Sequence, residues 1–169
     1  MSRDFEQDLL VGDYGEKLWS DYLKTKGHAD VYLSEKNSPV YWDVLLVTDN
    51  ETLTFEVKYD EQAYVWADKT NRPPNLFLEY WSETRNEPCG VMILESDYLS
   101  YIVKSPEGDI SYLFKVDDLI SHLKEASRTN KYRTVRNSLN GNNNVKGWAI
   151  PIQEITKKEY GFIKQIKLT

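Results

Sequence analysis

Three charged residues at a fixed spacing are the part of this sequence that can do chemistry: Asp43, Glu56 and Lys58. Residues 52–58, TLTFEVK, alternate between apolar and polar side chains, which predicts a half-buried β-strand. Glu56 and Lys58 therefore share the polar face of that strand. This spacing alone is typical of a solvated face, so its meaning depends on what lies opposite.

Residues 41–47, YWDVLLV, predict a second strand, and the segment 48–51 between the two strands has the composition of a turn. A hairpin centred on that turn places apolar residues opposite one another on one face. A register slip of one residue would turn all of them away from the core. The apolar pairs are Trp42–Val57, Val44–Phe55 and Leu46–Leu53. On the other face, Asp43 is then directly opposite Glu56.

Two carboxylates in this position repel each other, because directly opposite residues have Cβ atoms about 4.5–5.5 Å apart. Asp43 and Glu56 therefore need a shared proton, a basic neighbour or a bound cation. Two hard oxygen ligands at this spacing suit Mg²⁺ or Mn²⁺. Lys58 lies one step along the same face, within reach of a water molecule or a phosphate. The alternative is a solvent-exposed edge of the sheet, at which the charge of Lys58 neutralises both acids.

A further acid lies in the first predicted helix, which runs from residue 4 to about residue 25 and has an apolar stripe. Glu16 interrupts that stripe on the face expected to pack against the sheet. Gly12 and Gly15 near it lower helix propensity but allow close approach of the backbone. Glu16 alone is consistent with a side chain that extends outward. Together with the hairpin acids, it favours a site.

This arrangement resembles the PD-(D/E)xK nuclease superfamily, in which a helix carrying Glu precedes an Asp and then (D/E)-x-K on the next strand. The matching residues are Glu16, Asp43 and 56-EVK-58, within a resemblance that covers residues 5–60. Pro39 lies four residues before Asp43 rather than next to it, a variation that the superfamily tolerates. The resemblance implies a restriction-endonuclease-like fold.

The resemblance also implies roles for the matching residues. Asp43, Glu56 and the backbone carbonyl of Val57 would bind Mg²⁺ or Mn²⁺, and Lys58 would position or activate the attacking water. Glu16 would steady a second ion or its waters. The expected product is a 5′-phosphate end.

A weaker resemblance extends into 75-NLFLEYWS-82 and 97-DYLSYIV-103. These segments look like small phage-type members of the superfamily, similar in size to Holliday-junction resolvases. This resemblance implies that Glu79 is an accessory acid. It also implies a protein encoded by a phage and acting in the host cytoplasm.

The charge distribution predicts where a nucleic acid would bind. The formal net charge is −6, but residues 124–146 contain six Lys or Arg against one acid, so this segment carries +5 and the remainder −11. Such a segment can neutralise phosphates without reading sequence. The residues expected to contact DNA are Lys131, Arg133, Arg136 and Lys146. The alternative is an ordinary solvated hairpin around the turn 140-NGNNN-144.

The order of predicted elements indicates an α/β (α+β) fold, with a mixed sheet flanked by helices in a single domain over residues 1–169. The segment 59–75 is expected to be a loop, at least in its second half, because it contains two prolines. A helix is expected from Asp118 to about Ala126, capped by Asp117. Strands are expected near 29–34, 40–48, 51–58, 76–81, 90–94, 99–103, 109–114, 131–137 and 145–150. For 76–81, the aromatic residues favour a strand, and a single helical turn is the alternative.

Composition narrows the class of protein and the cellular compartment. With 40% hydrophobic and 13% aromatic residues, the 169-residue chain has the composition of a globular protein that can bury a core. There is no apolar run long enough to span a bilayer and no secretory signal pattern at the N-terminus. Cys89 is the single cysteine and cannot form an internal disulfide, which fits the reducing cytosol. The expected location is therefore the cytoplasm, with no membrane partner.

The sequence therefore predicts a Mg²⁺- or Mn²⁺-dependent endodeoxyribonuclease, acting on branched or distorted DNA. Symmetric cutting of two strands would favour a homodimer. The competing interpretation is a non-catalytic DNA- or protein-binding module on the same fold. The retention of Asp43, Glu56 and Lys58 together favours the enzyme. A third interpretation, a phosphate-free Mg²⁺ or carboxylate enzyme, is not supported by a glycine-rich phosphate loop or a nucleophile motif.

Overall fold

The structure, a computed structural model, describes residues 5–27, 30–35, 38–139 and 143–169. Residues 140–142 of the predicted Asn-rich turn lie outside the described residues. The elements are α1 (Phe5–Thr25), β1 (Asp30–Leu33), β2 (Val44–Val47), β3 (Thr52–Asp60), α2 (Ala63–Thr70), β4 (Asn75–Ser82), β5 (Glu87–Pro88), η1 (Gly90–Ile93), β6 (Tyr98–Ser105), β7 (Gly108–Lys115), α3 (Val116–Arg128), β8 (Arg133–Leu139), β9 (Asn143–Pro151), α4 (Ile152–Ile155), η2 (Lys158–Tyr160) and β10 (Phe162–Lys167).

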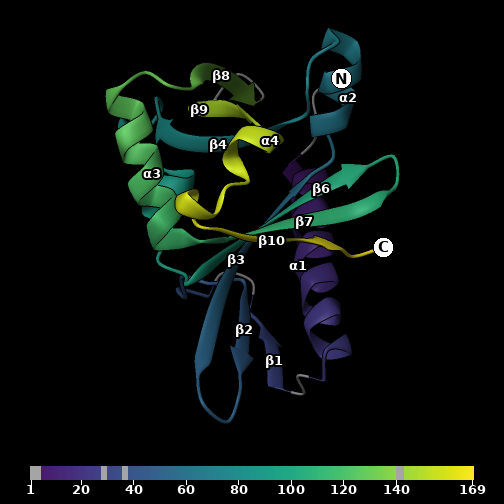
Figure 1. Cartoon of the computed structure of the whole chain (residues 1–169). Helices are drawn as coiled ribbons and strands as arrows, with labels where there is room; N and C mark the ends of the chain where they lie inside the picture. The colour runs from purple at the N-terminus through teal and green to yellow at the C-terminus, as the bar shows by residue number, and fades with distance from the viewer. Residues whose placement is uncertain (1–4, 28–29, 36–37, 140–142) are drawn as a thin grey trace.

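The strands form two sheets (Figure 1). The six-stranded sheet has the order β1-β2-β3-β6-β7-β10, and the four-stranded sheet has the order β5-β4-β9-β8. β3 and β6 are parallel, whereas the other described neighbours in the larger sheet are antiparallel, so the sheet is mixed. β4 and β5 lie in the chain segment that connects the parallel strands β3 and β6. The predicted α/β (α+β) fold with a mixed sheet flanked by helices is confirmed.

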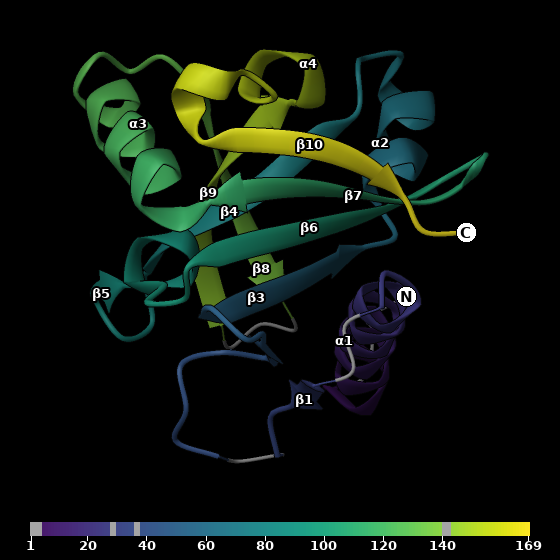
Figure 2. The same ribbon diagram turned by 60° about the horizontal axis from the view of Figure 1, so that its bottom comes forward.

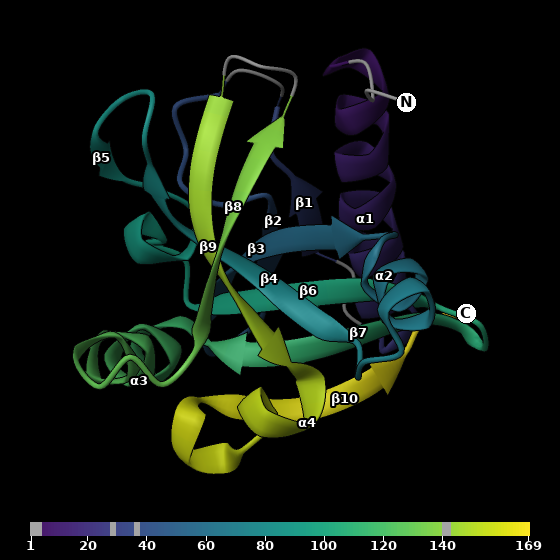
Figure 3. The same ribbon diagram turned by 90° about the horizontal axis from the view of Figure 1, so that it is seen from above.

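Helix α1 covers one face of the six-stranded sheet, and the second sheet lies on the other side (Figure 2). Figure 3 shows β9 running across β6 and β7 rather than along them. Under α1, Trp19 and Leu23 pack with Val44, Phe55 and Val57 in one buried cluster. A larger cluster fills the space toward the second sheet, α2 and α3. Among the described helices, none has the length and apolarity required to cross a membrane.

The apolar hairpin register predicted from the sequence is confirmed where β2 and β3 pair. Val44 is opposite Phe55, and Leu46 is opposite Leu53. The pairing ends at Val44, so the strand predicted over 40–48 is shorter than expected. The cause is the backbone at Asp43, described with the site below.

One helix was not expected in the segment 59–75. α2 begins at Ala63 because the Asp60 carboxylate accepts hydrogen bonds from the backbone N–H groups of Gln62 and Ala63, at 2.7 and 3.0 Å. These bonds satisfy amide donors that the first turn of a helix leaves free. The prediction of a loop holds only after Thr70.

Two other local predictions are wrong. Residues 90–94 form the 3-10 helix η1 rather than a strand, because Gly90 adopts a left-handed φ of 54° and turns the chain away from an extended path. The helix α3 begins at Val116 without a side-chain cap from Asp117. The Val116 N–H donates to the Asp97 carbonyl at 3.0 Å, and this backbone bond takes the place of the cap.

Candidate active site

Asp43 lies where β2 separates from β3. Its N–H donates to the Phe55 carbonyl at 2.9 Å, and its Oδ2 accepts a hydrogen bond from the Val57 N–H at 2.7 Å. The Asp43 carboxylate thus accepts the hydrogen bond from β3 that a backbone carbonyl would accept if the β2 strand continued. The regular ladder ends at the Val44–Phe55 pair, so the predicted pairing of Asp43 with Glu56 lies one residue beyond it and is replaced by the contacts of Asp43 with Phe55 and Val57.

The two carboxylates nevertheless interact strongly. Burial, and after it the nearby carboxylate of Glu56, together raise the pKa of Asp43 from 3.8 to about 6. The hydrogen bond from Val57 and the charge of Lys58 oppose this shift without cancelling it. The predicted repulsion between Asp43 and Glu56 is therefore present in the fold, and it is only partly compensated.

Lys58 is the cation of the site. Its Nζ lies 3.0 Å from Glu56 Oε1, and its side chain is 51% exposed. Burial lowers the pKa of Lys58, but the charges of Glu56, Asp43 and Glu79 outweigh that effect and raise its pKa above the ordinary value. In the absence of a bound cation, Lys58 is therefore an ammonium group at neutral pH and can only donate hydrogen bonds.

Glu79 approaches the site from the second sheet. It lies in β4 beside a bulge between Glu79 and Trp81, and its charge contributes to the raised pKa of Lys58. The buried Tyr101 of β6 fixes β4 nearby, since its hydroxyl accepts a hydrogen bond from the Phe77 N–H at 3.1 Å and donates to Asp60 Oδ2 at 3.1 Å. The structure thus brings Glu79 near the residues of β3.

The backbone of Glu79 also packs against Gly90. A substitution at Gly90 therefore tests the packing that positions Glu79. A Cβ added at Gly90 would lie 2.5 Å from the Glu79 carbonyl oxygen and 2.7 Å from its Cβ, at a φ that side chains rarely adopt. We expect Gly90→Ala to destabilise the protein by about 1–3 kcal/mol, because backbone strain of this kind has that cost.

Urea unfolding measures this effect, with Gly12→Ala as the matched control. A Cβ at Gly12 meets nothing within 4 Å, so that substitution should instead stabilise α1 by about 1 kcal/mol. Equal unfolding free energies for Gly90→Ala and the native chain would contradict the close packing of Gly90 on Glu79.

Helix α1 packs on the face of β3 that carries Tyr59. A Cβ added at Gly15 would lie 2.8 Å from Tyr59 Cβ, so the predicted close approach of this helix is confirmed. By the alternation of the strand, Lys58 faces the other way. Glu16 is half-buried in α1 beside this contact. Its participation in the site stays a prediction.

The predicted DNA-contacting residues do not share one environment. Arg136 and Lys146 both pair with Glu83 Oε1, at 2.8 and 3.2 Å, and these charges lower the pKa of Glu83. Lys131 precedes β8 and donates to the Tyr160 hydroxyl at 3.0 Å. Arg133, the first residue of β8, is exposed. Sequence reasoning missed Glu83, which lies far from its two partners along the chain.

Asp43, just before β2, and Glu56 of β3 fit a small divalent cation. Within the described ranges, no three His, Cys, Asp or Glu side chains gather closely enough to hold a metal by themselves. Mg²⁺ is commonly held by one or two carboxylates and otherwise keeps its waters or binds substrate phosphates. The partly compensated charge of Asp43 and Glu56, with the Val57 carbonyl next to them, matches that requirement.

Comparison with protein-family models gives no match, and comparison with curated protein sequences gives none either. Among solved structures, the chain is similar to a bacterial homing endonuclease, I-Ssp6803I. The two have 20% sequence identity and a TM-score of 0.49, over 66% of this chain and 71% of the other. At this level of similarity, function has to be inferred from the chain's own residues.

Proposed function

We propose that this protein is a Mg²⁺- or Mn²⁺-dependent endodeoxyribonuclease of the PD-(D/E)xK type. The observation that carries the proposal is the contact between Lys58 and Glu56 at 3.0 Å, next to an Asp43 whose pKa is raised to about 6 by burial and by Glu56. A half-exposed cation beside two crowded carboxylates suits the hydrolysis of a phosphodiester better than it suits a stabilising ion pair.

Each residue has a separate task in this proposal. Asp43, Glu56 and the Val57 carbonyl hold the ion, which when bound supplies Lewis-acid stabilisation of negative charge on the phosphate. Lys58 donates hydrogen bonds to the attacking water or to a phosphate oxygen. Glu79 keeps Lys58 charged and oriented through its own charge. Glu16 is assigned to the waters around a second ion.

The reaction itself is the hydrolysis of a P–O3′ bond. The oxygen of water bonds to phosphorus, the 3′ oxygen leaves and takes up a proton, and the products are a 5′-phosphate and a 3′-hydroxyl. Branched or distorted DNA is the proposed substrate, and cytoplasm the proposed location. A homodimer would allow both strands to be cut symmetrically.

Replacing Lys58 by alanine is expected to lower the cleavage rate by about 10²-fold or more, because a positioned proton donor contributes 10²- to 10⁴-fold. The measurement is cleavage of linear duplex, supercoiled plasmid, single strand and a four-way junction in Mg²⁺ or Mn²⁺, with an EDTA control. Lys115→Ala is the matched control, since Lys115 is 54% exposed and pairs with Asp118 at 3.8 Å.

The outcomes separate the enzyme from its main alternative. Cleavage that requires the metal, persists in Lys115→Ala and disappears in Lys58→Ala would establish the nuclease, and the preferred substrate would give its class. A folded protein that binds DNA in EDTA but cuts no substrate would support the non-catalytic binding module.

A further inference from the structure

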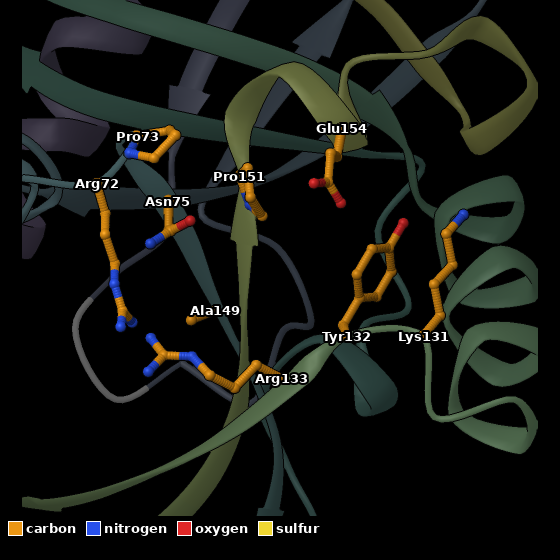
Figure 4. Close-up of a pocket in the computed structure, with 9 residues that line it drawn as sticks. All are labelled: Arg72, Pro73, Asn75, Lys131, Tyr132, Arg133, Ala149, Pro151 and Glu154. Carbon is orange, nitrogen blue, oxygen red and sulfur yellow. The ribbon is translucent and has the colours of Figure 1, made fainter.

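Two arginines that are distant in the sequence meet in a pocket at the start of β4. Arg72 follows α2, and Arg133 begins β8; both line the pocket and both are exposed. Figure 4 shows their guanidinium groups directed toward each other across the same space, with Asn75 above them. Neither Arg72 nor Asn75 was identified from the sequence.

The backbone holds both arginines in place. Asn71 adopts a left-handed φ of 50° at the end of α2, and its N–H closes the last helical turn. Pro73 and Pro74 follow Arg72 and restrict it to an extended conformation. Arg133 is held by its pairing with β9. The backbone from which each guanidinium group extends is therefore restrained, and the exposed side chains reach the pocket from fixed points.

No carboxylate of the described residues pairs with either of these cations. Among the ion pairs of the described residues, neither Arg72 nor Arg133 has a partner. Glu154 also lines the pocket, but Figure 4 shows its carboxylate beside Tyr132, away from the two guanidinium groups. Like charges this close repel, and an anion between them would remove the repulsion.

We infer that Arg72 and Arg133 form an oxyanion subsite that binds a backbone phosphate of DNA. Guanidinium groups match the oxygens of phosphate in a fork geometry, and the Asn75 amide can donate a further hydrogen bond. The identification of the anion as a DNA phosphate rests on the proposed function. An inorganic or nucleotide phosphate has the same chemistry.

Strand β4 connects this subsite to the proposed catalytic residues. Asn75, Phe77 and Glu79 alternate with the buried Leu76 and Leu78, so they share one face of the strand. Four residues of strand span about 13 Å, which corresponds to about four nucleotides of axial rise. The subsite would therefore hold a phosphate of the same DNA several nucleotides from the bond that is cut.

This subsite changes the predicted DNA contact. Arg136 and Lys146 already share the carboxylate of Glu83, so a phosphate would have to displace that partner. Within the described ranges, Arg72 and Arg133 have no such competitor. Arg133 is thus the member of the basic segment 124–146 that we expect to contribute most to DNA binding, together with an arginine from outside that segment.

The test is equilibrium binding of a fluorescent duplex and a fluorescent four-way junction in EDTA, over a range of salt concentrations. We expect the double variant R72Q/R133Q to bind at least about tenfold more weakly, because charge-assisted hydrogen bonds are lost. The slope of log K against log salt should fall in magnitude by about 1, the value for one phosphate contact. The control K164Q/K167Q removes two exposed lysines of β10 and should leave the slope unchanged.

Unchanged affinity and slope in R72Q/R133Q would overturn the subsite, and metal-dependent cleavage by that variant at the native rate would leave the proposed function intact. If the native chain binds neither DNA probe, inorganic phosphate becomes the probe. A rise in melting temperature with phosphate that R72Q/R133Q lacks would then retain the subsite while the proposed function fails. No rise in the native chain would overturn both.

Discussion

Replacing Asp43 by asparagine is expected to make the metal-free protein more stable at pH 8 and to lower its cleavage rate by about 10³-fold or more. Asparagine keeps an oxygen that can accept the hydrogen bond from the Val57 N–H, now 2.7 Å long, but it carries no charge. The repulsion from Glu56 therefore disappears while the backbone contact stays. Loss of a metal ligand removes several kcal/mol of transition-state stabilisation, which corresponds to the lost rate.

The pH dependence follows from the direction of the pKa shift. The pKa of Asp43 rises from 3.8 to about 6 on folding, so the folded state holds its proton at pH values where the unfolded state has lost it. The contribution of Asp43 to the free energy of unfolding is therefore fully present below pH 4, and it is lost as the pH rises through about 6. The loss amounts to about 1–3 kcal/mol, which Asp43→Asn should recover at pH 8.

Urea unfolding in EDTA at pH 4 and pH 8 measures this difference. Asp49→Asn is the matched control, because Asp49 is exposed in the turn between β2 and β3 and should change stability little at either pH. Added Mg²⁺ should stabilise the native chain and not Asp43→Asn, because only the former retains both carboxylate ligands. An Asp43→Asn variant that is less stable than the native chain at pH 8 would show that the Asp43 charge is favourably compensated.

The sequence predicts the centre of the site because one local pattern determines it. Alternation in 52–58 and the opposing apolar strand leave one register that buries Val44 against Phe55, and Lys58 then has to lie beside Glu56. The departure at Asp43 could not be read from alternation. It arises because the Asp43 carboxylate competes with a backbone carbonyl for the hydrogen bond of the Val57 N–H. Such a side-chain contact leaves no periodic pattern in the sequence.

Non-local features could not be predicted. The weaker resemblance implied Glu79 as an accessory acid, but periodicity could not place it, because its position depends on a second sheet inserted between the parallel strands β3 and β6. Helix α2 had a usable signal, since an Asp two residues before its N-cap can accept hydrogen bonds from the backbone N–H groups that open the helix, but the two prolines after the helix favoured a loop. Arg72 had only the following prolines to suggest a fixed position.

Replacing Asp109 by alanine is expected to destabilise the protein by about 3–5 kcal/mol, because it removes the anchor between α1 and the sheet. Asp109 is 6% exposed, and its carboxylate accepts hydrogen bonds from the hydroxyls of Tyr14 at 3.0 Å and Tyr59 at 2.7 Å. The hydrogen bond to Asp109 is the main reason that the pKa of Tyr14 is raised. Alanine would remove both hydrogen bonds to a charged group and leave the half-buried Tyr59 hydroxyl without this partner.

The control for this prediction is Tyr14→Phe, which removes one hydrogen bond and should lower the unfolding free energy by only about 1 kcal/mol. Amide hydrogen exchange distinguishes local detachment of α1 from destabilisation of the whole protein. Local detachment would increase the exchange rate in α1 more than in β6 and β7, whereas destabilisation of the whole protein would increase it in all three. Cleavage should fall further in Asp109→Ala than in Tyr14→Phe, because the same helix carries Glu16. Uniform exchange across the chain, with cleavage intact in a folded Asp109→Ala protein, would mean that the packing of Trp19 and Gly15 alone positions the helix.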